Sequence, residues 1–389
     1  MKSDGALRLV AWETTRECNL SCVHCRAAAG KGPYEGELST ERGMALLSEI
    51  AKAARESAPK GGHPGGAPGG AGERPAGHPG ASGHPGAKPG GPEGFRPIVI
   101  LTGGEPLLRP DIFDLARAGR ALGLRMVMAP NGTLLTPETA KRLVESGIER
   151  ISISLDGAGP EIHDRFRGVP GAFEAALSGI RNARDAGLPF QINTTVTRQT
   201  LADVEAVEDL AVSLGAEAHH VFLLVPTGRG KYIAGEGMDA AQYEKTLSWF
   251  CERRDKVPLQ LKATCAPHYY RIIRQKAKAE GKTVTFASHG LDAVTRGCLG
   301  GTGFCFVSHV GIVQPCGFLD IPCGDVTKEP FDLIWRDSEV FRNLRDYDNL
   351  KGKCGRCQYR AVCGGCRARA YEKSGDYLAE EPLCAYSPA

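Results

Sequence analysis

Cys18-Asn-Leu-Ser-Cys22-Val-His-Cys25 sets three cysteines at C-x3-C-x2-C spacing, directly after an apolar run, Leu7 to Trp12, that predicts a β-strand. A structural zinc site uses four protein ligands. A [4Fe-4S] cluster held by three thiolates instead keeps one iron open for a small molecule. We therefore predict that Cys18, Cys22 and Cys25 hold such a cluster, with a zinc knuckle or unrelated thiols as the alternatives.

The length, net charge and cysteine count of the sequence exclude several classes of protein. Its 389 residues can bury a large core and form more than one domain, and its net charge of +3 argues against nucleic acid held by bulk charge. No apolar run approaches the roughly 18 residues of a membrane span and no signal peptide opens the chain, so we expect a cytoplasmic protein without a membrane partner. Fourteen cysteines without an export signal indicate metal or cluster ligation, and oxygen-labile clusters indicate an anaerobic cell.

Residues 59–94 interrupt the pattern with a run dominated by Gly, Pro, Ala and His. Such a composition has almost no apolar side chains to offset the entropy of ordering, so we predict a disordered insertion. His63, His78 and His84 recur in Gly-His-Pro units. Weak binding of a metal or haem by these histidines is the alternative.

Deleting residues 59–94 should therefore leave the fold, the cluster content and turnover nearly unchanged. Circular dichroism, iron analysis and an activity assay on the deletion variant would check this. A variant that loses ligand binding would show that the histidines have a role.

Strands and helices alternate through the first part of the chain. Strands are predicted at 7–12, 97–102, 124–128, 150–155, 190–196 and 220–225, with helices near 40–57, 111–122, 137–146, 171–186 and 201–214. This alternation predicts an α/β fold, a partial (β/α)6 TIM-like barrel with ligands at the carboxyl ends of its parallel strands. We expect this barrel over residues 1–225, a helical linker or substrate region over 226–290, and a smaller cysteine-rich domain over 291–389, with a hairpin around Gly311.

Polar residues follow the predicted strands where a ligand is expected. Thr102-Gly103-Gly104-Glu105-Pro106 follows the second strand; its glycines allow close approach of the backbone, and Glu105 offers an acceptor. The other candidates at strand ends are Asn131, Ser154, Asp156 and Arg167. An ordinary Asp-Gly turn or a surface arginine is the alternative for each of these four.

These motifs together resemble those of the radical S-adenosylmethionine (SAM) enzymes. The resemblance implies that SAM chelates the open iron, that Gly103, Gly104 and Glu105 bind its methionyl ammonium, and that Asn131, Ser154, Asp156 and Arg167 lie near its ribose and carboxylate. His24 departs from the pattern, because the family usually has an aromatic residue before the last cysteine. Its flat imidazole can pack similarly.

The C-terminal cysteines resemble those of SPASM domains, which carry auxiliary [4Fe-4S] clusters in many radical SAM enzymes. The resemblance implies one or two auxiliary clusters. One would be held by Cys298, Cys305, Cys316 and Cys366, and the other by Cys354, Cys357, Cys363 and Cys384. Cys363 and Cys366 are separated by two residues where the family usually has three, which leaves this partition open. Two zinc ribbons are the alternative.

Basic and aromatic residues mix between the two predicted domains. Arg and Lys suit carboxylates and tyrosines suit a flat ring, so the candidate substrate contacts are Arg229, Lys262, His268, Tyr269 and Arg271. Cys265 or His268 could also contact a metal. Helix packing with a solvated basic face is the alternative.

Three segments, 262–271, 296–305 and 363–371, resemble the radical SAM enzymes of the siroheme-dependent haem pathway and of haem d1 synthesis. The resemblance implies oxidative decarboxylation of two propionates of Fe-coproporphyrin III to vinyl groups, with a flavodoxin or ferredoxin as electron donor. SAM would yield a 5′-deoxyadenosyl radical that takes a propionate β-hydrogen, after which carbon dioxide and one electron leave. The alternatives are a sister enzyme acting on modified sirohaem, a peptide-modifying SPASM enzyme and a non-enzymatic electron-transfer or zinc scaffold.

Overall fold

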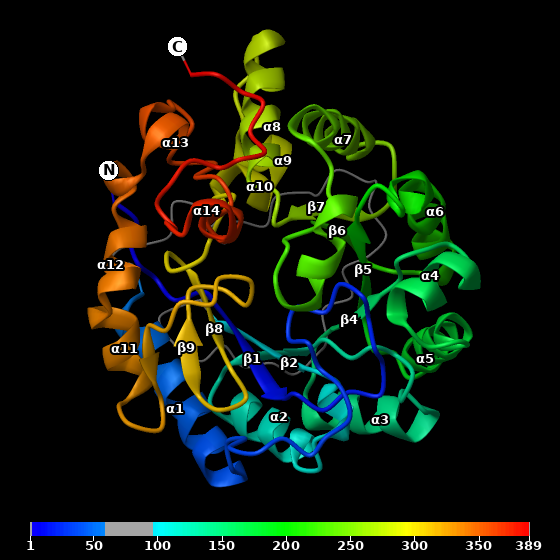
Figure 1. Ribbon diagram of the computed structural model, residues 1–389. Coiled ribbons are helices and arrows are strands. Elements are labelled where there is room, and N and C mark those ends of the chain that lie inside the picture. The colour runs from blue at the N-terminus through cyan, green and yellow to red at the C-terminus, as the bar shows by residue number, and fades with distance from the viewer. Residues whose placement is uncertain (1, 59–95, 389) are drawn as a thin grey trace, which may run out of the picture.

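One mixed sheet of ten strands forms the centre of the molecule, as seen in a computed structural model that describes residues 2–58 and 96–388 (Figure 1). The strands are β1 (Leu9–Thr15), β2 (Ile98–Gly103), β3 (Arg125–Met128), β4 (Ile151–Ser154), β5 (Phe190–Val196), β6 (Ala218–Leu223), β7 (Gln260–Thr264), β8 (Phe304–Val307), β9 (Ile312–Gln314) and β10 (Gly324–Asp325). Their spatial order is β10-β9-β8-β1-β2-β3-β4-β5-β6-β7. The predicted insertion 59–94, with His63, His78 and His84, lies outside the described residues.

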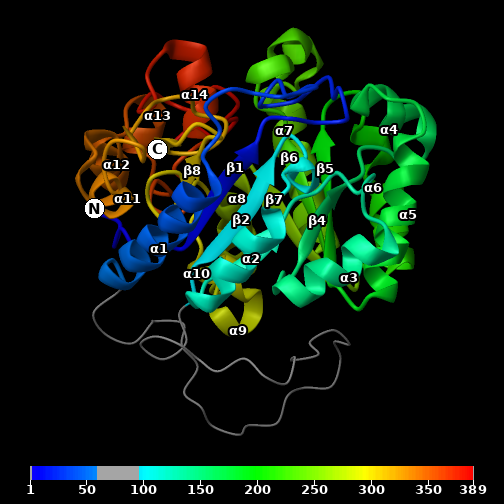
Figure 2. The same cartoon turned by 90° about the horizontal axis from the view of Figure 1, so that it is seen from below.

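Helices cover the outer face of the curved sheet (Figure 1; Figure 2). The helices of the described residues are α1 (Thr40–Glu56), α2 (Ile112–Ala121), α3 (Pro137–Ser146), α4 (Pro160–Arg167), α5 (Ala172–Asp185), α6 (Val204–Leu214), α7 (Ala240–Arg253), α8 (His268–Ala279), α9 (Phe286–His289), α10 (Leu291–Val294), α11 (Phe331–Asp337), α12 (Glu339–Arg345), α13 (Gly352–Arg356) and α14 (Arg367–Ser374), of which α13 and α14 lie in the C-terminal region away from the outer face (Figure 1). Ser39 caps α1, as predicted, by accepting the N–H of Arg42. Among the helices of residues 2–58 and 96–388, none is long and apolar enough to cross a membrane.

The pleat of the strands separates two faces. In β2, Val99 and Leu101 are buried in the core with residues of α1 and α2, whereas Ile98 and Ile100 are half-buried on the concave face. The same alternation holds in β4 and β5. Side chains on the concave face and loops at the carboxyl ends of the strands therefore remain available for a ligand.

The six predicted β/α units are confirmed, and the structure adds two parallel strands to them. β7 pairs with β6 inside the region predicted as helical, and β8 pairs in parallel with β1 on the side opposite β2. The predicted hairpin is confirmed, since β8 and β9 are antiparallel. The first strand of the chain is thus an interior strand, and one sheet joins the barrel to the C-terminal region. The domain boundaries at 225 and 290 remain a proposal.

Candidate functional site

The loop after β1 presents the three cysteines that the sequence singled out. Cys18 and Cys22 are buried, Cys25 is half-buried, and all three are free thiols. Each sulfur accepts one N–H hydrogen bond: Cys18 from Leu20 N at 3.4 Å, Cys25 from Ala29 N at 3.4 Å, and Cys22 from Arg167 Nη1 at 3.6 Å. Donors aimed at sulfur stabilise thiolates and tune the potential of an iron-sulfur cluster. The donor set therefore fits the predicted cluster.

Burial also controls the protonation of this loop. It raises the pKa of Cys18 to about 11 and moves the pKa of Cys22 above its usual range. Both groups are neutral thiols at pH 7 until iron displaces their protons. The loop is thus built for a bound cation and not for free thiolates.

Arg229, in the 3-10 helix η3 (Gly228–Glu236), holds the cysteine loop. Its Nε donates to Cys22 O at 2.8 Å, its Nη1 to Ala29 O at 2.7 Å, and its backbone N to Cys25 O at 2.9 Å. The guanidinium is therefore engaged by backbone carbonyls. The geometry assigns Arg229 to positioning the loop, which differs from the substrate contact expected from the sequence.

His24 packs as its flat ring predicts. The imidazole stacks on Phe166 with ring centroids 4.3 Å apart and planes 19° apart. Burial lowers the pKa of His24 to about 4, so the ring is neutral at pH 7. It thus supplies the planar packing surface that an aromatic residue would supply.

The Gly-Gly-Glu motif lies against the entry to the cysteine loop. Gly104 N donates to Thr15 O at 2.8 Å, and a Cβ on Gly104 would lie 2.1 Å from Glu17 O. The close approach that these glycines allow is therefore to the chain itself. Glu105 accepts from Leu107 N at 3.1 Å and Asn131 N at 2.6 Å, and burial raises its pKa to about 7 despite these hydrogen bonds.

The polar residues at the ends of β3 and β4 also converge on the loop. Asn131 Nδ2 donates to Asn19 Oδ1 at 2.7 Å, which brings Asn19 into a site that the sequence did not assign to it. Arg167 pairs with Asp156, and both are buried. Ser154 ends β4 half-buried on the concave face. The structure thus gathers the predicted SAM contacts around the cysteine loop, and their contacts with SAM remain a prediction.

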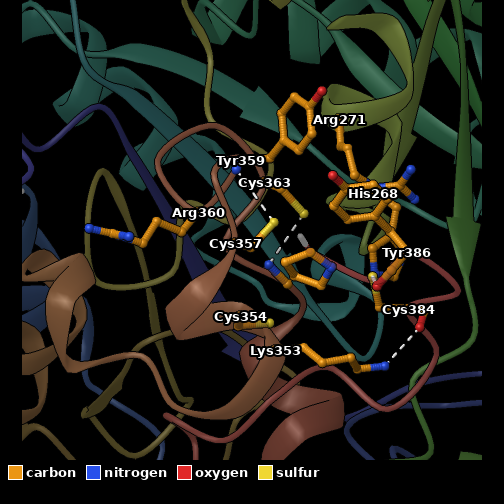
Figure 3. A pocket seen from close by; sticks show the side chains of 13 residues that line it. His268, Arg271, Lys353, Cys354, Cys357, Tyr359, Arg360, Cys363, Cys384 and Tyr386 are labelled. Atoms are coloured by element: carbon orange, nitrogen blue, oxygen red, sulfur yellow. Dashed lines mark hydrogen bonds between the residues drawn. The ribbon is translucent and has the colours of Figure 1, made fainter. Parts of the chain in front are cut away.

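Four C-terminal cysteines line one pocket, as one predicted set requires (Figure 3). They are Cys354, Cys357, Cys363 and Cys384. Backbone N–H groups reach three of the sulfurs: Glu381 N to Cys354 at 3.4 Å, Tyr359 N to Cys357 at 3.4 Å, and Gly365 N to Cys363 at 3.5 Å. This donor set again suits cluster thiolates.

We propose a second set that differs from the predicted one in a single member, with Cys265 in place of Cys305. Burial raises the pKa of Cys265 well above its usual range, and Cys366, Cys316 and Cys298 are the cysteines whose charges would raise it further. Cys265, Cys316 and Cys366 also pack against the same small apolar cluster. Cys265 has φ of 55°, a left-handed conformation that is costly without glycine. This strained residue lies in the loop directly after β7.

Cys305 does not join this set, contrary to the sequence-based expectation. It lies on β8 beside Val10 of β1, fully buried in the main core. Burial raises the pKa of Cys305 well above its usual range, and Cys323 is the cysteine whose charge raises it further. Cys305 thus packs in the main core and not with the apolar cluster that Cys316 and Cys366 share, which supports Cys265 in its place.

Replacing Cys265 with Ala should therefore remove the iron and sulfide of one cluster, whereas Cys305→Ala should leave the iron content unchanged. Cys305→Ala is a matched control because both thiols are removed from buried or half-buried positions. Iron and sulfide analysis of anaerobically purified protein would measure the difference. Loss of a cluster in Cys305→Ala alone would return Cys305 to the ligand set.

A buried polar network links the two C-terminal cysteine sets. Arg369 Nε pairs with Glu381 Oε1 at 3.0 Å, and Glu381 Oε2 accepts from Cys366 N at 2.5 Å. Arg369 Nη2 donates to Tyr243 Oη at 2.7 Å, and Tyr243 Oη donates to Cys265 O at 2.9 Å. Both charges are almost fully buried, so breaking the pair would be strongly destabilising.

Three of the predicted substrate contacts face the protein interior. His268 is fully buried against Tyr243, with ring centroids 5.0 Å apart, and also lines the pocket of the four cysteines. Tyr269 is fully buried in the main core, and Arg271 pairs with Glu244. Helix packing, the alternative for this segment, accounts for these positions. Lys262 differs, because it lies half-buried on the concave face of β7.

Among residues 2–58 and 96–388, no three His, Cys, Asp or Glu side chains are arranged to hold a single metal ion. A zinc knuckle needs four ligands around one ion. The thiolates of a [4Fe-4S] cluster bind different irons and so stand further apart.

Comparison with known proteins places this arrangement among iron-sulfur enzymes. Residues 89–211 match the Radical SAM superfamily, and residues 298–358 match SPASM, an iron-sulfur cluster-binding domain. The chain is 50% identical over 381 residues to the "AdoMet-dependent heme synthase" of Nitratidesulfovibrio vulgaris, covering 98% of this chain and 93% of that protein. It is 30% identical to the "Fe-coproporphyrin III synthase" of Methanosarcina barkeri, covering 97% and 85%. Its fold is similar to that of Streptococcus suis SuiB bound to S-adenosylmethionine, with a TM-score of 0.69 at 14% identity, covering 98% and 78%.

Proposed function

This chain belongs to the radical SAM superfamily, and we propose that it is a haem b synthase, which converts two propionates of Fe-coproporphyrin III into vinyl groups by oxidative decarboxylation. The observation that carries the proposal is its 50% identity, over nearly its whole length, to a protein named AdoMet-dependent heme synthase. The proposal also agrees with two further groups of four cysteines in the C-terminal part of the chain, in addition to the three-cysteine loop.

The residues of the chain divide the work of such a reaction. Cys18, Cys22 and Cys25 would hold a [4Fe-4S] cluster whose fourth iron binds SAM, and the C-terminal cysteines would hold auxiliary clusters. When bound, these groups supply hydrogen abstraction from the substrate and an acceptor for the electron that is released. Arg167 and Arg229 orient the cysteine loop, and the buried strand ends around Glu105 keep water from this edge of the sheet.

Anaerobic turnover tests the proposal directly. The reconstituted protein, with SAM and a reduced flavodoxin or ferredoxin as donor, should convert Fe-coproporphyrin III into a product lighter by two carboxyl groups and two hydrogens, seen by mass spectrometry. The second candidate is a sister enzyme acting on didecarboxysirohaem, favoured by the 30% identity to the Fe-coproporphyrin III synthase. Conversion of didecarboxysirohaem and not of Fe-coproporphyrin III would replace the first proposal with the second.

A further inference from the structure

Four side chains form a row across the concave face of the sheet. Ser154 of β4 is in register with Asn193 of β5, Asn193 with His220 of β6, and His220 with Lys262 of β7. All four are half-buried, whereas their sequence neighbours Ile192, Val221 and Ala263 are buried in the core. With neighbouring strands about 4.8 Å apart, the row is about 14 Å long. We call it the donor row.

Lys262 ends the donor row with a charge that has no close partner. Among residues 2–58 and 96–388, its ammonium makes no hydrogen bond and no ion pair within 4 Å, and a half-buried ammonium is rarely left so. Burial lowers the pKa of Lys262, and the carboxylate of Asp292 in α10 opposes this shift. Asp292 has a partner of its own, Arg254, at 3.9 Å. Lys262 is thus placed to receive an anion.

The other members of the row also present donors. Gln191 Nε2 lies 2.9 Å from His220 Nδ1 and donates to Asn193 Oδ1 at 3.0 Å. An amide nitrogen is only a donor, so His220 Nδ1 accepts and the proton of its neutral ring is on Nε2. The Asn193 oxygen is occupied, which leaves its NH₂ group free. The row therefore offers a hydroxyl, an amide NH₂, an imidazole N–H and an ammonium.

Two other strands contribute apolar side chains to the concave face. β2 and β3 present Ile98, Ile100 and Val127 there, all half-buried, together with the polar Arg125 and Thr102. A concave face that carries both apolar side chains and a row of donors suits a flat, apolar ligand with carboxylates on its rim.

We propose that the donor row binds a propionate carboxylate of the porphyrin substrate, with Lys262 as its charged anchor. This inference rests on the proposed function. Pairing with an ammonium stabilises a carboxylate relative to neutral carbon dioxide, so the anchored propionate is one that is kept in the product. The reacting propionate lies toward Ser154, the end of the row where SAM is predicted to bind.

Binding of Fe-coproporphyrin III and of its methyl ester tests the proposal, with affinity read from the Soret band of the anaerobic, cluster-loaded protein without SAM. Lys262→Met should weaken binding of the free acid by about tenfold or more, because it removes a charge-assisted hydrogen bond, and should leave ester binding unchanged. Lys262→Arg should restore most of the affinity for the acid. Lys245→Met, on the exposed side of α7, is the matched control and should bind as the wild type does.

Each other outcome overturns the assignment. Equal affinity of the wild type and Lys262→Met for the free acid removes Lys262 from the site. Weaker binding of the ester as well would show a packing effect, and weaker binding of SAM alone, seen in the EPR spectrum of the reduced first cluster, would assign the row to the SAM carboxylate. A wild type that binds neither porphyrin overturns the proposed function together with the row. A wild type that converts the porphyrin, with Lys262→Met binding it equally well, overturns the row alone.

Discussion

Replacing Cys18, Cys22 and Cys25 together with Ala is expected to lower the reductive cleavage of SAM below detection, with the C-terminal iron and sulfide retained. The three thiols lie on one loop, and no other cysteine is part of it. Without these three ligands the protein cannot hold the cluster whose open iron would bind SAM. Chromatography of 5′-deoxyadenosine after reduction with dithionite measures the loss, and iron analysis measures what remains.

Cys251→Ala provides the control for this experiment, because Cys251 of α7 is half-buried and packs against the core apart from all three cysteine sets. It should cleave SAM at the wild-type rate. Continued formation of 5′-deoxyadenosine by the triple variant would show that the radical-generating cluster is elsewhere.

Changing Cys357 and Cys363 to Ala should lower vinyl formation steeply while SAM cleavage in the presence of substrate continues. Decarboxylation of a propionate radical to a vinyl group releases one electron, which needs an acceptor before the product leaves. Both residues line the pocket of four cysteines, which lies in the C-terminal region and not on the cysteine loop after β1. Quantifying 5′-deoxyadenosine and haem in the same reaction separates the two steps.

Damage to the fold is the competing cause of such a loss, because a cluster also stabilises the small region that binds it. Circular dichroism and the iron content of the remaining sites distinguish the two causes. A well-folded double variant that converts Fe-coproporphyrin III at the wild-type rate would exclude a required acceptor role for this cluster.

The sequence predicts the alternating part of the fold well, because each early strand is an apolar run or an alternating segment between helical patterns. It misses β7 because that strand has only five residues, and its basic and polar side chains, Lys262 and Thr264, favour a helical substrate region. Only pairing with β6 reveals the strand. The short helix α4 is missed because it begins directly after the Asp-Gly turn of β4.

The grouping of the C-terminal cysteines likewise could be predicted only in part from the sequence. The resemblance to SPASM domains implies Cys354, Cys357, Cys363 and Cys384 as one set, although the spacing leaves the partition open. It also implies Cys305 for the other set, whereas the structure packs Cys265 against the same apolar cluster as Cys316 and Cys366. Which face of β8 a residue occupies depends on the register with β1, and the left-handed turn at Cys265 depends on packing after β7. Neither can be read from residue types alone.

The pairing of β1 with both β2 and β8 has a consequence for how the chain matures. During synthesis β1 emerges long before β8, so one of its edges stays open until Phe304–Val307 leaves the ribosome. An open parallel edge is prone to pair with other chains, and contacts between distant segments form slowly. Two contacts of the cysteine loop region also come from the late segment: Arg26 lies over the Phe306 ring at 4.3 Å, and Glu13 accepts from His309 Nδ1 at 2.9 Å. We therefore expect products truncated before β8 to aggregate. We also expect the cysteine loop region to gain its contacts with Phe306 and His309 only late in folding.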